Sequence, residues 1–271
     1  MSMIPLDDLS LHLEESGAGE PVLLLHGLGS SGRDWEFVAP GLAAHHRVLV
    51  PDVRGHGRSD KPEGPYGVPL FARDMAALCA RLGLTRVHVV GLSMGGMIGF
   101  QLAVERPELV RSLTVINSGP DMVPRTLRMR LMFATRMLLL KTLGPRILAR
   151  LIAPKLFPKP EQAALRQRVE ESIGANEPGA YQRATRGLVG WSVLDRLKEI
   201  SCPVLVLASD HDYTPLSAKK AYASLLADAR LQELRDSGHA APIDQPGQIL
   251  DAVKGFFAEV EGMARDERTV G

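Results

Sequence analysis

The sequence predicts an α/β protein built on a mostly parallel sheet, and two observations support that prediction. Short apolar runs recur along the chain, each with the length and composition of a strand that is buried on both faces. Longer segments with the spacing of amphipathic helices lie between these runs. Buried strands that alternate with helices form a parallel sheet covered on both faces. The 271 residues are enough for one large domain or two small ones.

The first predicted strand is the alternation of Leu9, Leu11 and Leu13, which is typical of an edge strand with one buried face. The following apolar runs are continuous, so each is expected inside the sheet. These runs are residues 22–25, 48–50, 87–90, 113–116 and 204–208. The helices expected between and after them are residues 70–82, 94–105, 217–226 and 246–260.

Residues 120–190 interrupt the alternation of strands and helices. Several helical segments are expected there, separated by glycine and proline. From residue 120 to 189 there are 13 Lys+Arg and 5 Asp+Glu, a net charge of +8, whereas the remainder has a net charge of −7. We therefore predict a core formed by 1–119 and 191–262, an insertion at 120–190 with its own surface role, and a disordered tail at 263–271.

Composition excludes several classes of protein. The chain has 32 Lys+Arg and 31 Asp+Glu, and a net charge of +1 gives no reason to expect a nucleic-acid partner. The N-terminus lacks the pattern of a signal peptide, and no apolar run approaches the length of a membrane span. Cys79 and Cys202 are expected to be reduced core thiols. These features predict a cytoplasmic protein.

Ser93 has the sequence context of a nucleophile elbow. It is the centre of a G-x-S-x-G sequence between the predicted strand at 87–90 and the predicted helix at 94–105. The serine of this motif lies in a tight turn, and the residues two positions away on each side must be small because the backbone passes close to them. Gly91 and Gly95 meet that need. The N-terminus of the following helix favours negative charge beside the serine.

A serine nucleophile needs a base, and the base needs a group that orients it. Among eight histidines, His239 lies in a loop before the last predicted helix, from which it can reach the C-terminal edge of the sheet. His88 lies inside a predicted buried strand and is expected to be structural. The acid should lie between the serine and the histidine in the chain. Asp210 and Asp212 both follow the predicted strand at 204–208, and the pattern leaves both open.

His211 lies between these two aspartates, and both residue types are common metal ligands. Neighbours on one loop make a poor metal cage without a third and a fourth ligand. We therefore expect no metal site, and nothing in the sequence predicts an organic cofactor.

Five segments together resemble the α/β-hydrolase superfamily over nearly the whole chain. They are HGLG at 26–29, PDVRGHGRSD at 51–60, GLSMGG at 91–96, the aspartate loop at 210–215 and SGH at 237–239. The resemblance implies an α/β-hydrolase fold, in which an eight-stranded, mostly parallel sheet has helices on both faces and a helical cap is inserted after the sixth strand. Residues 120–190 match the cap position. Ser209 departs from the pattern, because a glycine is usual there.

The same resemblance implies a catalytic triad of Ser93, Asp212 and His239. It also implies an oxyanion hole formed by the backbone N–H groups of Leu28 and Met94, whose geometry rather than side-chain identity matters. The residues expected to support these loops are His26, Gly27, Gly91 and Gly95.

The predicted function is therefore that of a serine hydrolase that cleaves a small or medium carboxylic ester through an acyl-enzyme. Dehalogenases and epoxide hydrolases of this fold have an aspartate at the elbow, where this chain has Ser93. Four alternatives stay open: an enol-lactonase, a C–C bond hydrolase of aromatic degradation, a cofactor-free perhydrolase or haloperoxidase, and a non-catalytic ligand receptor. The expected partner is a small-molecule ester or lactone, and the oligomeric state is left open.

In the predicted cap, residues 127–141 combine apolar and basic side chains at near-helical spacing. One hypothesis is an apolar acyl pocket with a cationic rim for anionic or lipid-like esters, which is related to a basic amphipathic helix at a membrane surface. The other, which we favour, is an ordinary helix whose apolar side chains pack on the protein body while its arginines are solvated.

Overall fold

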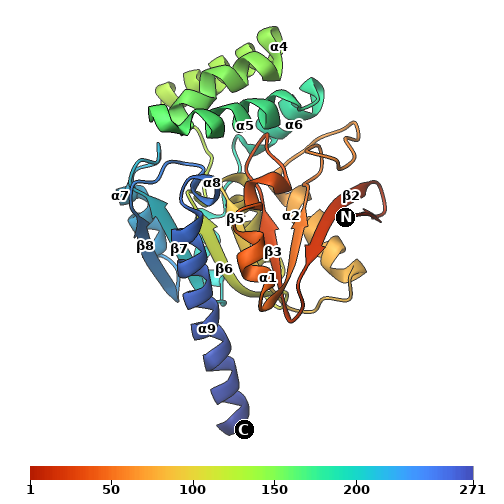
Figure 1. Ribbon diagram of the computed structural model, residues 1–271, viewed down its shortest axis with the longest axis vertical. Helices are drawn as coiled ribbons and strands as arrows, with labels where there is room; N and C mark the ends of the chain where they lie inside the picture. The colour runs from red at the N-terminus through yellow and green to blue at the C-terminus, as the bar shows by residue number, and fades with distance from the viewer. Residues whose placement is uncertain (271) are drawn as a thin grey trace.

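The computed structural model describes residues 1–270, with side chains described up to Met263, and its centre is an eight-stranded sheet (Figure 1). The strand order is β1-β2-β4-β3-β5-β6-β7-β8. The pairs β1–β2 and β2–β4 are antiparallel, and the five other pairs are parallel. The predicted mostly parallel sheet is thus confirmed. The strands are β1 (Ser2–Pro5), β2 (Ser10–Ser16), β3 (Glu20–Leu25), β4 (His46–Pro51), β5 (Val87–Leu92), β6 (Val110–Ile116), β7 (Val204–Ser209) and β8 (Ala229–Leu234).

The prediction that the segment around Leu11 forms the edge of the sheet was wrong. β1 pairs outside β2, with Ile4 opposite Leu11, so β2 is the second strand. β1 is mostly exposed and only four residues long, and such a strand has no apolar pattern that a sequence can reveal.

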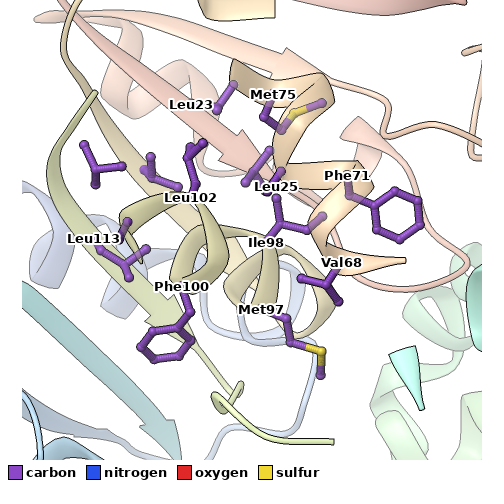
Figure 2. Close-up of a cluster of buried hydrophobic side chains, with 14 of the residues drawn as sticks. Leu23, Leu25, Val68, Phe71, Met75, Met97, Ile98, Phe100, Leu102 and Leu113 are labelled. Carbon is purple, nitrogen blue, oxygen red and sulfur yellow. The ribbon is translucent and has the colours of Figure 1, made fainter. Parts of the chain in front are cut away.

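The continuous apolar runs are explained by two cores, one on each face of the sheet. In β3, Leu23 and Leu25 face one core, whereas Val22 and Leu24 face the other, because side chains alternate along a strand. The first core packs against α2 (Val68–Arg81) and α3 (Met94–Glu105), as Figure 2 shows for Phe71, Met75 and Ile98. The second core packs against α1 (Ala39–Ala43) and α9 (Pro246–Val270).

Three α-helices lie between β6 and β7 in the chain and form a layer above one end of the sheet, called the cap below (Figure 1). They are α4 (Leu127–Leu156), α5 (Ala163–Gly174) and α6 (Pro178–Leu188), all within the predicted cap range. α4 is kinked at Gly144, whose φ of 74° is non-helical. The remaining helices are α7 (Leu216–Ala223) and α8 (Ala241–Asp244). No helix in the described part of the chain is both long enough and apolar enough to cross a membrane.

The interpretation that the apolar side chains of 127–141 pack on the protein body was wrong for four of them. Leu127, Leu131, Met132 and Leu138 are 58–72% exposed. α4 instead turns Leu140 toward the protein, and Leu140 packs in a small separate cluster with α5 and α6.

The backbone of the predicted tail is part of α9 up to Val270, and Gly271 lies outside the described residues. The disordered tail at 263–271 therefore stays a prediction.

Candidate active site

Ser93 lies at the turn between β5 and α3 with a strained backbone. Its φ of 52° and ψ of −113° are rarely adopted by a residue with a side chain. The turn is held because the Ser93 N–H donates to the carbonyl of Ile116 at 3.0 Å, and Ser118 Oγ donates to the Ser93 carbonyl at 2.6 Å. These two hydrogen bonds keep the serine at the carboxyl end of β5, directly before the first residue of α3.

The two glycines that flank the elbow have no space for a side chain. A Cβ on Gly91 would clash with the backbone of Gly95, and a Cβ on Gly95 would clash with the carbonyl of Leu25. The tight packing of β3, β5 and α3 thus requires the small residues that the motif predicts.

The loop after β3 lies directly beside Ser93. A Cβ on Gly27 would be only 3.7 Å from the Ser93 Cβ. The Gly27 N–H donates to buried Asp34 at 3.1 Å, whereas the Leu28 N–H has no hydrogen-bond partner among the described residues. The Met94 N–H is the first of α3, a position that has no acceptor within a helix. Both expected oxyanion donors therefore flank the serine with their N–H groups available.

His26 holds this loop in place and is not exposed to a substrate. Its Nε2 accepts the Val53 N–H at 2.9 Å, so its Nδ1 carries the proton and donates to the Gly27 carbonyl at 2.8 Å. The side chain is fully buried. His26 therefore connects the loop after β3 to the loop after β4.

Asp212 and His239 contact each other at the carboxyl edge of the sheet. Asp212 Oδ1 lies 2.7 Å from His239 Nδ1, and the Asp212 side chain is fully buried. Asp212 also binds Lys219 Nζ at 2.5 Å and the Thr214 hydroxyl. Burial acts to raise the pKa of Asp212, but His239, Lys219 and Thr214 outweigh it and lower the pKa to about 2. The ionised carboxylate can only accept, so it fixes the proton of His239 on Nδ1 and leaves Nε2 as an acceptor.

Asp210, the competing aspartate, holds the loop that carries His239. Its carboxylate accepts the backbone N–H groups of Asp236 at 2.8 Å and Ser237 at 2.9 Å. It makes no contact with the imidazole among the described side chains, and His211 beside it is exposed. Of the two aspartates, the structure brings only Asp212 to His239.

Ser209 is the departure from the family pattern, and its hydroxyl has a structural role here. It accepts from Asn117 Nδ2 at 2.7 Å and lies 2.8 Å from Ser237 Oγ. Asn117 Nδ2 also donates to the carbonyls of Gly238 at 3.1 Å and His239 at 3.0 Å. The side chain that replaces glycine thus helps to connect the end of β7 to the histidine loop.

The structure does not bring His239 directly onto Ser93 within the described residues. His239 Nε2 instead lies 2.7 Å from the hydroxyl of Tyr213, whose ring stacks on the imidazole with centroids 4.2 Å apart. Tyr213 therefore occupies the acceptor nitrogen of His239.

The cap contributes two residues above this arrangement. Tyr181 of α6 is fully buried, and a Cβ on Gly29 would be 2.8 Å from its ring, so it lies against the loop after β3. Arg136 of α4 donates from Nη2 to the Tyr181 hydroxyl at 3.0 Å. Burial acts to lower the pKa of Arg136, but Tyr181 and Tyr213 outweigh it and raise the pKa. A permanent positive charge is thus present near the site.

Sequence reasoning missed three residues of this site. Lys219 cannot be distinguished by pattern from Lys220, its exposed neighbour. Tyr213 follows the predicted acid directly, which was the only available signal. Arg136 was noted as one of several basic residues in 127–141, and only the fold separates it from the others.

A family model described as alpha/beta hydrolase fold matches residues 20–246, so the chain belongs to the alpha/beta hydrolases. This confirms the family resemblance. Among its relatives is a protein named putative carbamate hydrolase RutD from Azorhizobium caulinodans, 32% identical over 94% of this chain and 97% of that protein.

Solved structures in the same family are similar over nearly their whole length. A thermophilic esterase from Thermogutta terrifontis has a TM-score of 0.85 at 27% identity, covering 93% of this chain and 94% of its own. An enol-lactonase from Burkholderia xenovorans LB400 has a TM-score of 0.85 at 25% identity, covering 92% and 97%. The relatives are thus hydrolases of more than one kind, and the family alone does not define the substrate.

Proposed function

We propose that this alpha/beta hydrolase cleaves a small carboxylic ester through a covalent acyl-enzyme, with Ser93 as nucleophile, His239 as base and Asp212 as the orienting acid. Two features carry the proposal: the buried Asp212–His239 pair and the strained Ser93 turn. The loop after β6 contacts both, because Asn117 binds the His239 carbonyl and Ser118 binds the Ser93 carbonyl. An aspartate that fixes the imidazole proton on Nδ1 leaves Nε2 to accept the serine proton.

The reaction proceeds in two halves. When Tyr213 leaves His239, Nε2 takes the proton of Ser93 Oγ as the oxygen attacks the ester carbonyl. The N–H groups of Leu28 and Met94 bind the resulting oxyanion, and losing one such donor typically costs about 10²–10³ in rate. His239 then protonates the departing alcohol. It next activates the water that releases the acid and restores Ser93.

Carbamate hydrolysis is a second candidate, because the relative at 32% identity is named a putative carbamate hydrolase. The same groups apply, since a carbamate carbonyl also develops an oxyanion when it is attacked.

The test is turnover of p-nitrophenyl esters of graded acyl length by the wild type, Ser93→Ala and the distant control Ser224→Ala. We expect kcat to fall by about 10⁴–10⁶ in Ser93→Ala and to be unchanged in the control. Turnover that survives in Ser93→Ala would place the nucleophile elsewhere. A folded wild type that turns over carbamates but no ester would favour the second candidate.

A further inference from the structure

Arg136 differs from the other sheltered arginines among the described side chains, residues 1–263. Those arginines all pair with a carboxylate, except Arg166, which binds backbone carbonyls. The carboxylate-paired set is Arg47, Arg54, Arg111, Arg168, Arg183 and Arg230. Among the described residues, Arg136 has no carboxylate partner and its buried Nε has no hydrogen-bond partner. The Nε of Arg111 and of Arg183 is also unpaired, but each of these arginines binds a carboxylate through another nitrogen.

A buried guanidinium N–H without an acceptor is unfavourable, because the group loses its hydration and gains nothing in return. Among the described residues, the single partner of Arg136 is the Tyr181 hydroxyl, which accepts only one of its five N–H groups. The guanidinium therefore retains unused N–H groups on Nε and Nη1 and one on Nη2. Two parallel N–H groups of this kind match the two oxygens of a carboxylate.

Arg136 lies close to the proposed oxyanion loop. Tyr181, which it binds, lies against Gly29 of the proposed oxyanion loop. Arg136 is thus connected through the Tyr181 hydroxyl to the proposed oxyanion loop.

We propose that Arg136 binds a carboxylate carried by the substrate, so that the preferred substrates are anionic esters or lactones rather than neutral ones. The inference rests on the proposed function, because it assigns the substrate class of that same site. The carboxylate would satisfy Nε and offset the charge of the guanidinium.

The test compares two p-nitrophenyl esters that share the same leaving group. One is the neutral butyrate, and the other is the monoanionic half-ester of glutaric acid. We expect Arg136→Gln to lower kcat/KM for the half-ester by about 10- to 100-fold, mainly through KM, and to change the butyrate by less than about threefold. Arg136→Lys should retain part of the effect, because it keeps the charge but not the paired N–H groups. Arg128→Gln, on the exposed side of α4, is the matched control.

Each outcome separates this inference from the proposed function. Equal losses on both esters in Arg136→Gln would mean that the residue is structural, and no loss on either would mean that it does not bind substrate. Both results overturn the inference while Ser93-dependent turnover persists. Turnover that is independent of Ser93 would instead overturn the proposed function.

The outer face of α4 exposes many large apolar side chains. More than half of the large apolar side chains that are exposed in the described protein lie on this helix. Leu127, Leu131 and Leu138 recur at a spacing that brings them to one face. α4 also contains seven basic residues and no acidic one. An exposed apolar face on a helix whose charged residues are all basic is unusual on a protein surrounded by water.

We propose that this face of α4 docks on an anionic lipid surface. Apolar side chains would enter the headgroup boundary while the arginines and lysines bind lipid phosphates. A second copy of this chain is a poorer occupant, because a symmetric pair would bring fourteen positive charges together without any acid on either helix.

The test is flotation of the whole protein with vesicles of phosphatidylcholine alone or mixed with phosphatidylglycerol, beside size-exclusion measurements without lipid. We expect binding only to the anionic vesicles, weaker at high salt, and at least tenfold weaker in Leu131→Glu/Leu138→Glu. Leu225→Glu is the control, because Leu225 is also exposed but lies just after α7. Binding equal for both vesicles, no binding, or a dimer that the double substitution disrupts would overturn this proposal.

Discussion

The sheet edge and the cap contribute to the same site in different ways. At the sheet edge, the polar side chains around His239 are paired: Asp212 has three partners, and Asn117 connects β6, β7 and the histidine loop. In the cap, Arg136 retains unpaired N–H groups and α4 exposes apolar side chains. Complete pairing holds groups in one geometry, whereas unsatisfied groups are available to a ligand. Under the proposed function, the core would supply the reacting groups and the cap would select what enters.

The largest expected effect lies in the core. Asp212→Asn should lower kcat by about 10⁴, because the amide no longer fixes the proton of His239 on Nδ1. Asp210→Asn is the matched substitution, and we expect it to cost tenfold or less, since it only loosens the loop at Asp236 and Ser237. Steady-state kinetics on one ester checks both, and the reverse ranking would exchange the roles of the two aspartates.

The next largest effect is expected for Lys219→Met, which should lose about 3–5 kcal/mol in the free energy of unfolding. The substitution leaves the buried Asp212 charge without its cation. Lys220→Met, on the exposed neighbour, should change stability by less than about 0.5 kcal/mol. Urea denaturation of both variants at neutral pH measures the difference. Equal losses of stability in the two variants would mean that the Lys219–Asp212 pair does not stabilise the folded protein.

The same pair predicts a pH dependence. The pKa of Asp212 falls from 3.8 to about 2 on folding, so its ionisation stabilises the folded protein above pH 3.8. That contribution, about 2 kcal/mol, is lost as pH falls from about 4 to about 2. Without Lys219 the pKa of Asp212 rises, so Lys219→Met should lose less stability over this interval than the wild type does. Denaturation midpoints between pH 2 and pH 5 test this, and parallel curves would contradict it.

Gly95→Ala should destabilise the core by about 3 kcal/mol or prevent folding, because the new Cβ would clash with the Leu25 carbonyl. Gly255→Ala is the control, since nothing lies near its Cβ position in α9. Thermal unfolding should show a large fall in Tm for the first and no fall for the second. If Gly95→Ala had a normal Tm, the elbow would be less tightly packed than described.

The smallest effect is expected in the cap. Leu131→Ala on α4 should change the free energy of unfolding by less than about 0.5 kcal/mol, because the side chain is exposed. Leu113→Ala in the sheet should cost about 2–5 kcal/mol, because the side chain is fully buried. Equal costs would mean that the outer face of α4 is covered in the folded protein.

The sequence predicts the site residues that lie in local patterns, but not those whose role depends on contacts between distant segments. Ser93 and His239 were identifiable because the elbow and the loop before the last helix are local patterns. Asp212 needed the family resemblance, since two aspartates lie on one loop. Lys219 could not be predicted, because its role depends on contacts between α7 and two other loops. Arg136 could not be predicted either, because the pattern of α4 does not reveal which side faces the protein.

The two ends of the cap lie side by side, and this affects how the protein can change during evolution. Asp121 and Ser192 form an isolated β-bridge, and the Met122 N–H donates to the Trp191 carbonyl at 2.8 Å. A segment with adjacent ends can be lengthened, shortened or exchanged at little cost, because its length hardly alters the entropy of closing it. Descendants of such a chain can thus replace one insert while they inherit the Ser93 turn and the sheet below it unchanged.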